Sequence, residues 1–345
     1  MAYTISQVCG SYAMAQVEAL LKQEGIEKDG NLDYTCAMYD EDYNPIATGS
    51  CFGNTLRCFA VSRDHQGEGL LNEVVTHLIN YQYDRGNYAL FLYTKPESVA
   101  FFHDLGFYEI ARAEGQAVFM ENRRTGFASY LKGLGERDAD GVRSAAVVMN
   151  ANPFTLGHRY LLEKASREND VVHLFLVSED ASVFPFAVRK KLVEQGTADL
   201  KNLVLHDSGP YIISSATFPS YFLKDEMAVV QGHARLDLAV FTRIARALGI
   251  SRLYVGEEPT SATTSAYNQV MAEQLPRSGI ECVIVPRLEE QGRAISASTV
   301  RQCIQREDWA ELSRLVPETT LQWLQSPQAA PVRAKIKAME QVVHH

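Results

Sequence analysis

Two distant segments contain residues whose types and spacing could bind and activate a phosphate. The first is 150–158, N-A-N-P-F-T-L-G-H, which runs into an apolar stretch with helical periodicity. The start of a helix presents free N–H groups and a partial positive charge to an anion. His158 at that start could donate a hydrogen bond to a phosphate oxygen, and Gly157 would let a nucleotide approach closely. Taken alone, the segment could also be a helix-capping turn with a surface histidine.

The second segment is 295–301, I-S-A-S-T-V-R, at the start of another expected helix. Ser296, Ser298 and Thr299 offer hydroxyl groups and backbone amides, and Arg301 could bind two phosphate oxygens at once. The same residues would also suit a Ser/Thr helix cap followed by a surface arginine. Because the two segments lie at opposite ends of one α/β unit, together they favour a phosphate-binding site.

Alternating strands and helices in the second half of the chain must position these segments. The expected strands are 145–149, 172–177, 252–255 and 281–285, and the expected helices are 159–166, 185–196 and 236–248. Such alternation predicts a parallel sheet covered by helices on both faces. Ligands of these sheets bind beyond the carboxyl ends of the strands, so the loops that follow the strands should carry the chemistry.

A change in composition and periodicity separates this half from the rest of the chain. The stretch 131–141, L-K-G-L-G-E-R-D-A-D-G, is charged, glycine-containing and aperiodic, which indicates a linker. Aromatic-rich segments such as 90–93 precede it and favour β structure. The predicted α/β organisation is an α+β module, a linker, a phosphate-binding domain with a doubly wound parallel sheet and a C-terminal tail, at 1–130, 131–143, 144–330 and 331–345.

Length and composition limit the possible functions. A chain of 345 residues suits two domains, and a net charge of −9 argues against a general nucleic-acid binder. No apolar run approaches the roughly 20 residues of a membrane span, and the first residues lack a signal-peptide pattern. The six cysteines form no C-x-x-C pair. We therefore expect a cytoplasmic protein with reduced thiols and neither nucleic acid nor membrane as a partner.

The motifs T-x-G-H at 155–158 and I-S-x-S-x-x-R at 295–301 resemble those of the nucleotidyltransferase superfamily, which has a Rossmann-like fold and more often carries H-x-G-H. The longer string N-P-F-T-x-G-H, with V-G-E-E-P at 255–259, is more similar still to the citrate lyase ligase family. This resemblance implies catalytic roles for His158, Arg301 and Thr155, which stands in place of the first histidine. It also implies that ATP is bound by Asn150, Asn152, Phe154, Gly157, Arg189, Gly256, Glu257, Ser296, Ser298 and Thr299.

Some of these assignments have a structural alternative. Arg189, in F-P-F-A-V-R, resembles the family's phosphate-facing basic position, but it could also be an arginine on a solvated helix face. Gly256 and Glu257 would lie beside the adenine or ribose. Cys303 follows Arg301 by two residues, a spacing that points it elsewhere on a helix, and we expect it in the core.

For a member of this family the substrates would be acetate, ATP and the thiol of a CoA-derived prosthetic group on the acyl-carrier subunit of citrate lyase. Acetate would attack the α-phosphorus, releasing pyrophosphate, and the thiol would then displace AMP from acetyl-adenylate. Mg²⁺ is expected as a companion of ATP, although the sequence offers no acidic cluster to assign to it. A phosphopantetheine or other coenzyme adenylyltransferase would share every phosphate-site residue and stays an alternative. A non-catalytic partner of a carrier protein is another, for which an intact ATP site would be superfluous.

The N-terminal module resembles the GNAT-type acetyltransferases. Residues 64–69, D-H-Q-G-E-G, are similar to the loop that binds the CoA pyrophosphate in that family, which implies that Gln66, Gly67 and Gly69 face a CoA-like arm. Two departures matter: the loop opens with an acidic residue instead of Gln or Arg, and Phe102 stands where a tyrosine commonly serves as general acid. Docking or binding of a CoA-like arm is therefore favoured over active N-acetyl transfer, which stays a further alternative.

Overall fold

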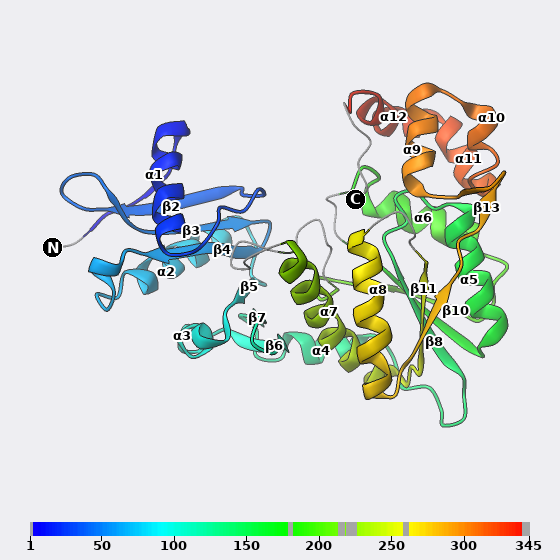
Figure 1. Ribbon diagram of the computed structural model, residues 1–345, viewed down its shortest axis with the longest axis horizontal. Helices are drawn as coiled ribbons and strands as arrows, with labels where there is room; N and C mark the ends of the chain where they lie inside the picture. The colour runs from blue at the N-terminus through cyan, green and yellow to red at the C-terminus, as the bar shows by residue number, and fades with distance from the viewer. Residues whose placement is uncertain (1–2, 179–181, 213–217, 219–225, 258–261, 340–345) are drawn as a thin grey trace. The chain divides into compact units, whose positions relative to one another are not determined.

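The computed structural model describes residues 3–178, 182–212, 218, 226–257 and 262–339 (Figure 1). The chain forms two compact units, one of Met1–Tyr130 with Thr217–Ala239 and one of Leu131–Ala216 with Val240–His345. Each unit contains a main sheet of its own, so the two are described in turn. The functional domain limits expected from the sequence stay predictions.

The first unit is built on a seven-stranded mixed sheet. Its strands are β1 (Ile5–Gln7), β2 (Tyr34–Tyr39), β3 (Pro45–Phe52), β4 (Thr55–Val61), β5 (Phe91–Thr94), β6 (Tyr108–Ala113) and β7 (Ala117–Glu121), in the order β1-β2-β3-β4-β5-β7-β6. Only β4 and β5 run parallel, and they pair at two positions, Thr55 with Phe91 and Leu56 with Leu92. All other neighbours are antiparallel. This is the α+β module expected from the sequence.

Helices of the first unit cover this sheet. They are α1 (Gly10–Gln23), α2 (Leu70–Asp84), α3 (Val99–Asp104) and the first residues of α4 (Gly126–Gly133). Apolar residues of α2 repeat at helical spacing, and Val74, Val75 and Leu78 are fully buried in one cluster with residues of β2 to β5. Burial of this face stabilises the module because it removes apolar area from water.

The second unit contains a five-stranded sheet in which every neighbouring pair is parallel. Its strands are β8 (Ser144–Met149), β9 (Val171–Leu176), β10 (Leu203–Asp207), β11 (Arg252–Gly256) and β12 (Glu281–Val285), in the order β10-β9-β8-β11-β12. The central strand β8 is almost wholly buried, as an uninterrupted apolar strand of a parallel sheet should be. The predicted α/β fold class with a Rossmann-like parallel sheet is confirmed.

Helices connect these strands and continue after them. They are α5 (Leu156–Glu168), α6 (Phe186–Gly196), α7 (Glu226–Leu248), α8 (Ala262–Gln274), α9 (Ala297–Arg306), α10 (Trp309–Leu312), α11 (Glu318–Gln325) and α12 (Ala330–Lys337), with a short hairpin of β13 (Glu289–Glu290) and β14 (Arg293–Ala294) before α9. Strand order reverses direction at β8, which has β9 on one side and β11 on the other. Such a point is where open parallel sheets bind ligands.

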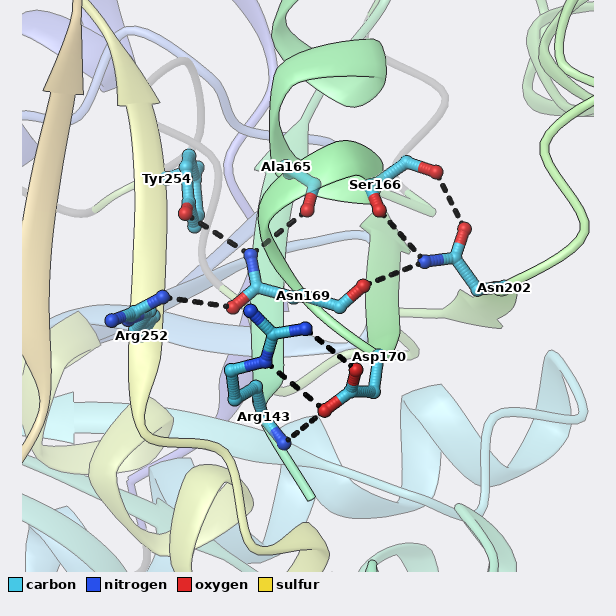
Figure 2. Close-up of polar contacts among 8 residues, drawn as sticks. All are labelled: Arg143, Ala165, Ser166, Asn169, Asp170, Asn202, Arg252 and Tyr254. Carbon is cyan, nitrogen blue, oxygen red and sulfur yellow. Dashed lines mark hydrogen bonds and ion pairs between the residues drawn. The ribbon is translucent and has the colours of Figure 1, made fainter. Parts of the chain in front are cut away.

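The amino ends of the strands are fastened by a polar network (Figure 2). Asn169 is nearly fully buried, and its Nδ2 donates to the carbonyl of Ala165 and to the hydroxyl of Tyr254. Asn202 donates to the carbonyls of Ser166 and Asn169, which joins the end of α5 to the segment before β10. Since these contacts occupy the edge opposite the carboxyl ends, they hold the sheet without blocking a ligand.

Segments expected to be a linker and a tail pack onto the second unit where they are described. Arg137 donates to the carbonyl of Arg246, and the N–H of Asp138 donates to the carbonyl of Leu248. Val332 and Ile336 of α12 are buried with the other C-terminal helices. All six cysteines are free, and Cys303 is fully buried, which confirms its predicted place in the core. None of the described helices is long and apolar enough to span a membrane.

A row of polar side chains in hydrogen-bonding distance of one another connects the linker to two strands. His173 of β9 lies 2.8 Å from His206 of β10, nitrogen to nitrogen, and its other ring nitrogen lies 2.9 Å from Oδ2 of Asp138. The ring of His206 also stacks on Phe175. Burial, followed by the neighbouring His173, lowers the pKa of His206 to about 4. His206 is therefore neutral in the folded protein at pH 7.

This histidine should make the stability of the protein depend on pH. Because the folded pKa is below the unfolded value of about 6.5, its contribution is complete above that value and is lost as pH falls toward about 4. We expect His206→Phe, which keeps the stacked ring, to reduce the loss of unfolding free energy over this window by up to about 3 kcal/mol. Urea unfolding at pH 7 and pH 4.5 measures it; equal pH dependence in variant and wild type would contradict the expectation.

Candidate functional site

The loop after β8 is held by hydrogen bonds to the segment before α6. The side-chain amide of Asn150 donates to Oγ of Ser182 at 3.0 Å. The side-chain oxygen of Asn152 accepts the N–H of Phe184, also at 3.0 Å, and Asn152 is nearly fully buried. Both asparagines therefore shape the loop. Their predicted contacts with ATP stay predictions.

Phe154, which the resemblance assigned to ATP binding, packs into the core. Its side chain is 0% exposed, and a Cβ at Gly196 would lie 2.6 Å from its ring. The ring also lies nearly parallel to that of His158, at 6.0 Å between centroids. A nucleotide could therefore meet only the backbone of Phe154, and its side chain supports the histidine.

The start of α5 fixes the orientation of the His158 ring and determines which ring nitrogen carries the proton. Thr155 is the N-cap, and its hydroxyl accepts the N–H of His158 while its own N–H donates to Nδ1 of the histidine ring at 3.1 Å. A ring nitrogen that accepts carries no proton, so the proton of the neutral ring is on Nε2. Burial, and then the charge of Arg287, lower the pKa of His158 to about 4. His158 thus offers one neutral N–H donor at the carboxyl edge of the sheet.

The backbone of the segment before α9 comes close to Gly157 at the start of α5. A Cβ at this position would lie 3.0 Å from the carbonyl oxygen of Ile295, a contact tighter than nine in ten that real Cβ atoms make. The nearest group to such a Cβ belongs to the second motif, and the predicted contact of Gly157 with a nucleotide stays a prediction. The two motifs, 150–158 and 295–301, therefore meet at the start of α5.

The second motif is both a helix cap and a clamp. Ser296 caps α9, because its hydroxyl accepts the N–H of Thr299 at 3.0 Å. Arg301 is only 2% exposed, and its Nη1 donates to the carbonyl of Asn152 at 2.6 Å while Nη2 donates to Ser298 at 3.3 Å. Burial lowers the pKa of the Arg301 guanidinium. The alternative that Arg301 is an arginine on the surface is excluded, because its side chain is buried and joins the two motifs.

Arg189 is also buried rather than on a solvated helix face. It is 0% exposed, and its guanidinium donates to the carbonyls of Asn150, Val177 and Phe184 at distances between 2.8 and 3.0 Å. Arg189 therefore holds the ends of β8 and β9 together. With Arg301 it places a second positive charge behind the loop after β8, where it favours an anion in front of that loop.

The end of β11 presents exposed backbone at the same edge of the sheet. Gly256 and Glu257 are exposed, and the carbonyl of Gly256 accepts from the side-chain amide of Asn268. The N–H of Glu257 donates to the carbonyl of Val285, which extends the pairing of β11 with β12. The rest of the V-G-E-E-P string, residues 258 and 259, lies outside the described residues.

Arg287 is a residue of this edge that the sequence analysis missed. Its Nε donates to the carbonyl of Glu257 at 2.7 Å, and its Nη1 donates to the carbonyl of Ile295 at 3.3 Å. The signal that could have found it is its place two residues after β12, at the carboxyl end of a parallel strand.

The loop 63–69 of the first unit is exposed and shaped by glycine. Gly67 and Gly69 have φ of +87° and +82°, values that residues with a side chain rarely adopt, and Gly69 is the N-cap of α2. Gln66 is exposed beside them. Phe102 is buried among the aromatic residues of α3 and β4, so its ring serves packing.

Within the described part of the chain, no group of three or more His, Cys, Asp or Glu side chains could hold a metal ion. The groups at the carboxyl edge are mainly cations, hydroxyls and amides, which suit phosphate oxygens, together with the exposed Glu257. For a magnesium ion that accompanies ATP, the described residues offer no cluster of this kind. We assign it no protein ligand.

Comparison with known proteins identifies relatives over nearly the whole chain. A family model described as "Citrate lyase ligase C-terminal domain" matches residues 144–324. The citrate (pro-3S)-lyase ligase of Haemophilus influenzae is 37% identical over 90% of this chain and 95% of its own. The proteins of the same name from Klebsiella pneumoniae and Escherichia coli are 43% and 39% identical, over 81% and 94% of this chain and 83% and 95% of theirs.

Proposed function

Since this chain belongs to the citrate lyase ligase family, we propose that it is an ATP-dependent ligase that acetylates the thiol of a CoA-derived group on the acyl-carrier subunit of citrate lyase. Acetate and ATP would be consumed, AMP and pyrophosphate released, and citrate lyase activated. The observation that supports this most directly is the hydrogen bond of Arg301 to the carbonyl of Asn152, which joins the two phosphate motifs at one edge of a parallel sheet.

In the first half-reaction a carboxylate oxygen of acetate forms a bond to the α-phosphorus while the bond to the pyrophosphate oxygen breaks. Negative charge grows on the phosphate oxygens, and a preoriented N–H donor stabilises it most where water is excluded. We assign this role to Nε2–H of His158, with Thr155 as the residue that positions its ring. The buried Arg189 and Arg301 add fixed positive charge behind the loop to this neutral donor.

The remaining ATP contacts follow from the placement of each segment. Ser296, Ser298 and Thr299 at the start of α9, with Arg301, would face the β- and γ-phosphates. The exposed backbone of Gly256 and Glu257, at the end of β11, would lie beside adenine or ribose. Gly157 and the backbone of 150–154 would line the loop between them.

In the second half-reaction the carrier's thiolate forms a bond to the acetyl carbon and AMP leaves. This transfer needs no cysteine of this chain. Among the cysteines, Cys303 lies nearest in sequence to a motif, and it is fully buried with a pKa raised to about 11 by burial. Such a thiol would be a poor nucleophile, which supports a direct transfer from adenylate to carrier.

The loop 63–69 of the first unit is proposed to bind the CoA-like arm of the carrier through Gln66, Gly67 and Gly69. We expect Gly67→Ala, which places a side chain at φ +87°, to distort this loop at a cost of about 1 kcal/mol and to raise the KM for the carrier. Acetate-dependent pyrophosphate exchange should stay unchanged, because the adenylate forms in the other unit. Steady-state kinetics with carrier subunit test this, and an unchanged KM in a folded variant would assign the loop no part in carrier binding.

Exchange of labelled pyrophosphate into ATP distinguishes the proposed reaction from its alternatives. Acetate should stimulate the exchange, and hydroxylamine should trap acetyl hydroxamate. Stimulation by phosphopantetheine instead would identify a coenzyme adenylyltransferase. Thioester formation without any acetate-dependent exchange would exclude the acetyl-adenylate.

A further inference from the structure

Arg287 lies where three loops at the carboxyl edge of the parallel sheet meet. It donates to the carbonyl of Glu257 after β11 and to the carbonyl of Ile295 before α9. The same Ile295 carbonyl lies against the backbone of Gly157 at the start of α5. Two hydrogen bonds to backbone carbonyls therefore hold Arg287 next to the residues that orient His158.

The charge of Arg287 also reaches His158. Burial, and after it the positive charge of Arg287, lowers the pKa of His158. A neutral His158 cannot compensate negative charge on a substrate by itself. Arg287 supplies a full positive charge at the point where the histidine supplies only a dipole.

The three arginines of this edge differ in exposure. Arg189 and Arg301 are 0% and 2% exposed and donate to carbonyls inside the protein, whereas Arg287 is partly exposed. A guanidinium that is already anchored loses little side-chain entropy when it binds an oxyanion. Among these three, Arg287 is the one placed to meet a ligand from solvent.

We infer that Arg287 is a substrate-binding residue that contacts an anionic oxygen beside His158, either a phosphate oxygen of ATP or the carboxylate of acetate. Both are oxyanions that a guanidinium binds by charge-assisted hydrogen bonds. The inference rests on the proposed function for the identity of the substrates, and on the contacts of Arg287 for its place. It gives the site a partly exposed cation in addition to the buried Arg189 and Arg301.

The test compares Arg287→Gln and Arg287→Met with the control Arg252→Gln. Arg252 begins β11 at the opposite edge of the sheet, so its variant removes the same net charge without touching the site. Calorimetry gives the Kd for ATP and for adenosine, and pyrophosphate exchange gives the KM for acetate. A phosphate contact predicts at least tenfold weaker ATP binding with adenosine unchanged, and a carboxylate contact predicts at least a tenfold higher KM for acetate with ATP unchanged. Either folded variant with wild-type values for both substrates, or an equal effect of Arg252→Gln, overturns the inference.

A second readout is independent of catalysis. In protein labelled with ¹⁵N-histidine, the His158 signals can be assigned with His158→Gln, and their pKa should rise in Arg287→Gln because a neighbouring positive charge has been removed. An unchanged pKa overturns the proposed proximity. If the wild type binds neither ATP nor acetate, the proposed function fails. The inference can then be tested separately with pyrophosphate alone as the oxyanion. Equal affinity of wild type and Arg287→Gln for pyrophosphate would overturn the inference.

Discussion

His158→Ala should lower kcat for acetate-dependent adenylation by roughly 10²–10³-fold while changing the KM for ATP much less. The reason is that Nε2–H of His158 faces charge that grows mainly in the transition state, so its loss removes stabilisation that the bound substrate uses little. The ring is fixed for this task by the N–H of Thr155 and by the parallel ring of Phe154. Single-turnover measurement of AMP or adenylate formation gives the rate of this step.

The matched variant His158→Gln carries an amide nitrogen near the position of Nε2 and should recover part of the lost rate. Cys303→Ala, in the core of the same unit, should leave kcat nearly unchanged. Because the pKa of His158 is lowered to about 4, its ring stays neutral above about pH 5, and the rate should not fall with titration of this group between pH 6 and 8. A folded His158→Ala protein with wild-type adenylation would show that the loop is only a structural turn, and the nucleotidyl-transfer proposal would fail.

Arg301→Ala should both raise the KM for ATP and lower kcat, and it should also destabilise the protein. The guanidinium of Arg301 bonds the carbonyl of Asn152 from a position that is 2% exposed. Its loss leaves a buried carbonyl without a charged donor, at a cost of about 1–3 kcal/mol, and frees the loop after β8 from α9. A loop that is no longer clamped would bind ATP less well in the ground state as well as in the transition state.

Two comparisons separate these effects. Arg301→Lys keeps the charge but not the planar fork, so it should lie between alanine and wild type. Arg306→Ala, on the exposed face of the same helix, should change neither kinetics nor stability. Urea unfolding and steady-state kinetics on the same preparations give both quantities. Wild-type ATP binding in a destabilised Arg301→Ala protein would limit this residue to a structural role.

The sequence by itself determined the family, the fold class and the two motifs. Apolar strands such as 145–149 and helices such as 185–196 are set by local periodicity, and their alternation requires a parallel sheet. The structure moves four of the eight ends of the predicted strands by one residue and leaves the other four where they were predicted. Strand β10 was missed because it lies at the edge of the sheet and is only partly buried, so its sequence L-V-L-H-D lacks a buried strand's pattern. Helix α7 begins ten residues before its predicted start, since Gly232 and His233 interrupt the apolar repeat.

Only the tertiary structure decided what each motif residue does. The sequence could not tell whether Arg189 and Arg301 face solvent, phosphate or the backbone, because the carbonyls that they bind lie up to 149 residues away in the chain. It gave no sign that the carbonyl of Ile295 lies beside Gly157, or that Arg287 reaches the same place. Motif types are local properties of the chain, whereas burial, charge and hydrogen-bond partners depend on which distant segments the fold packs around a residue.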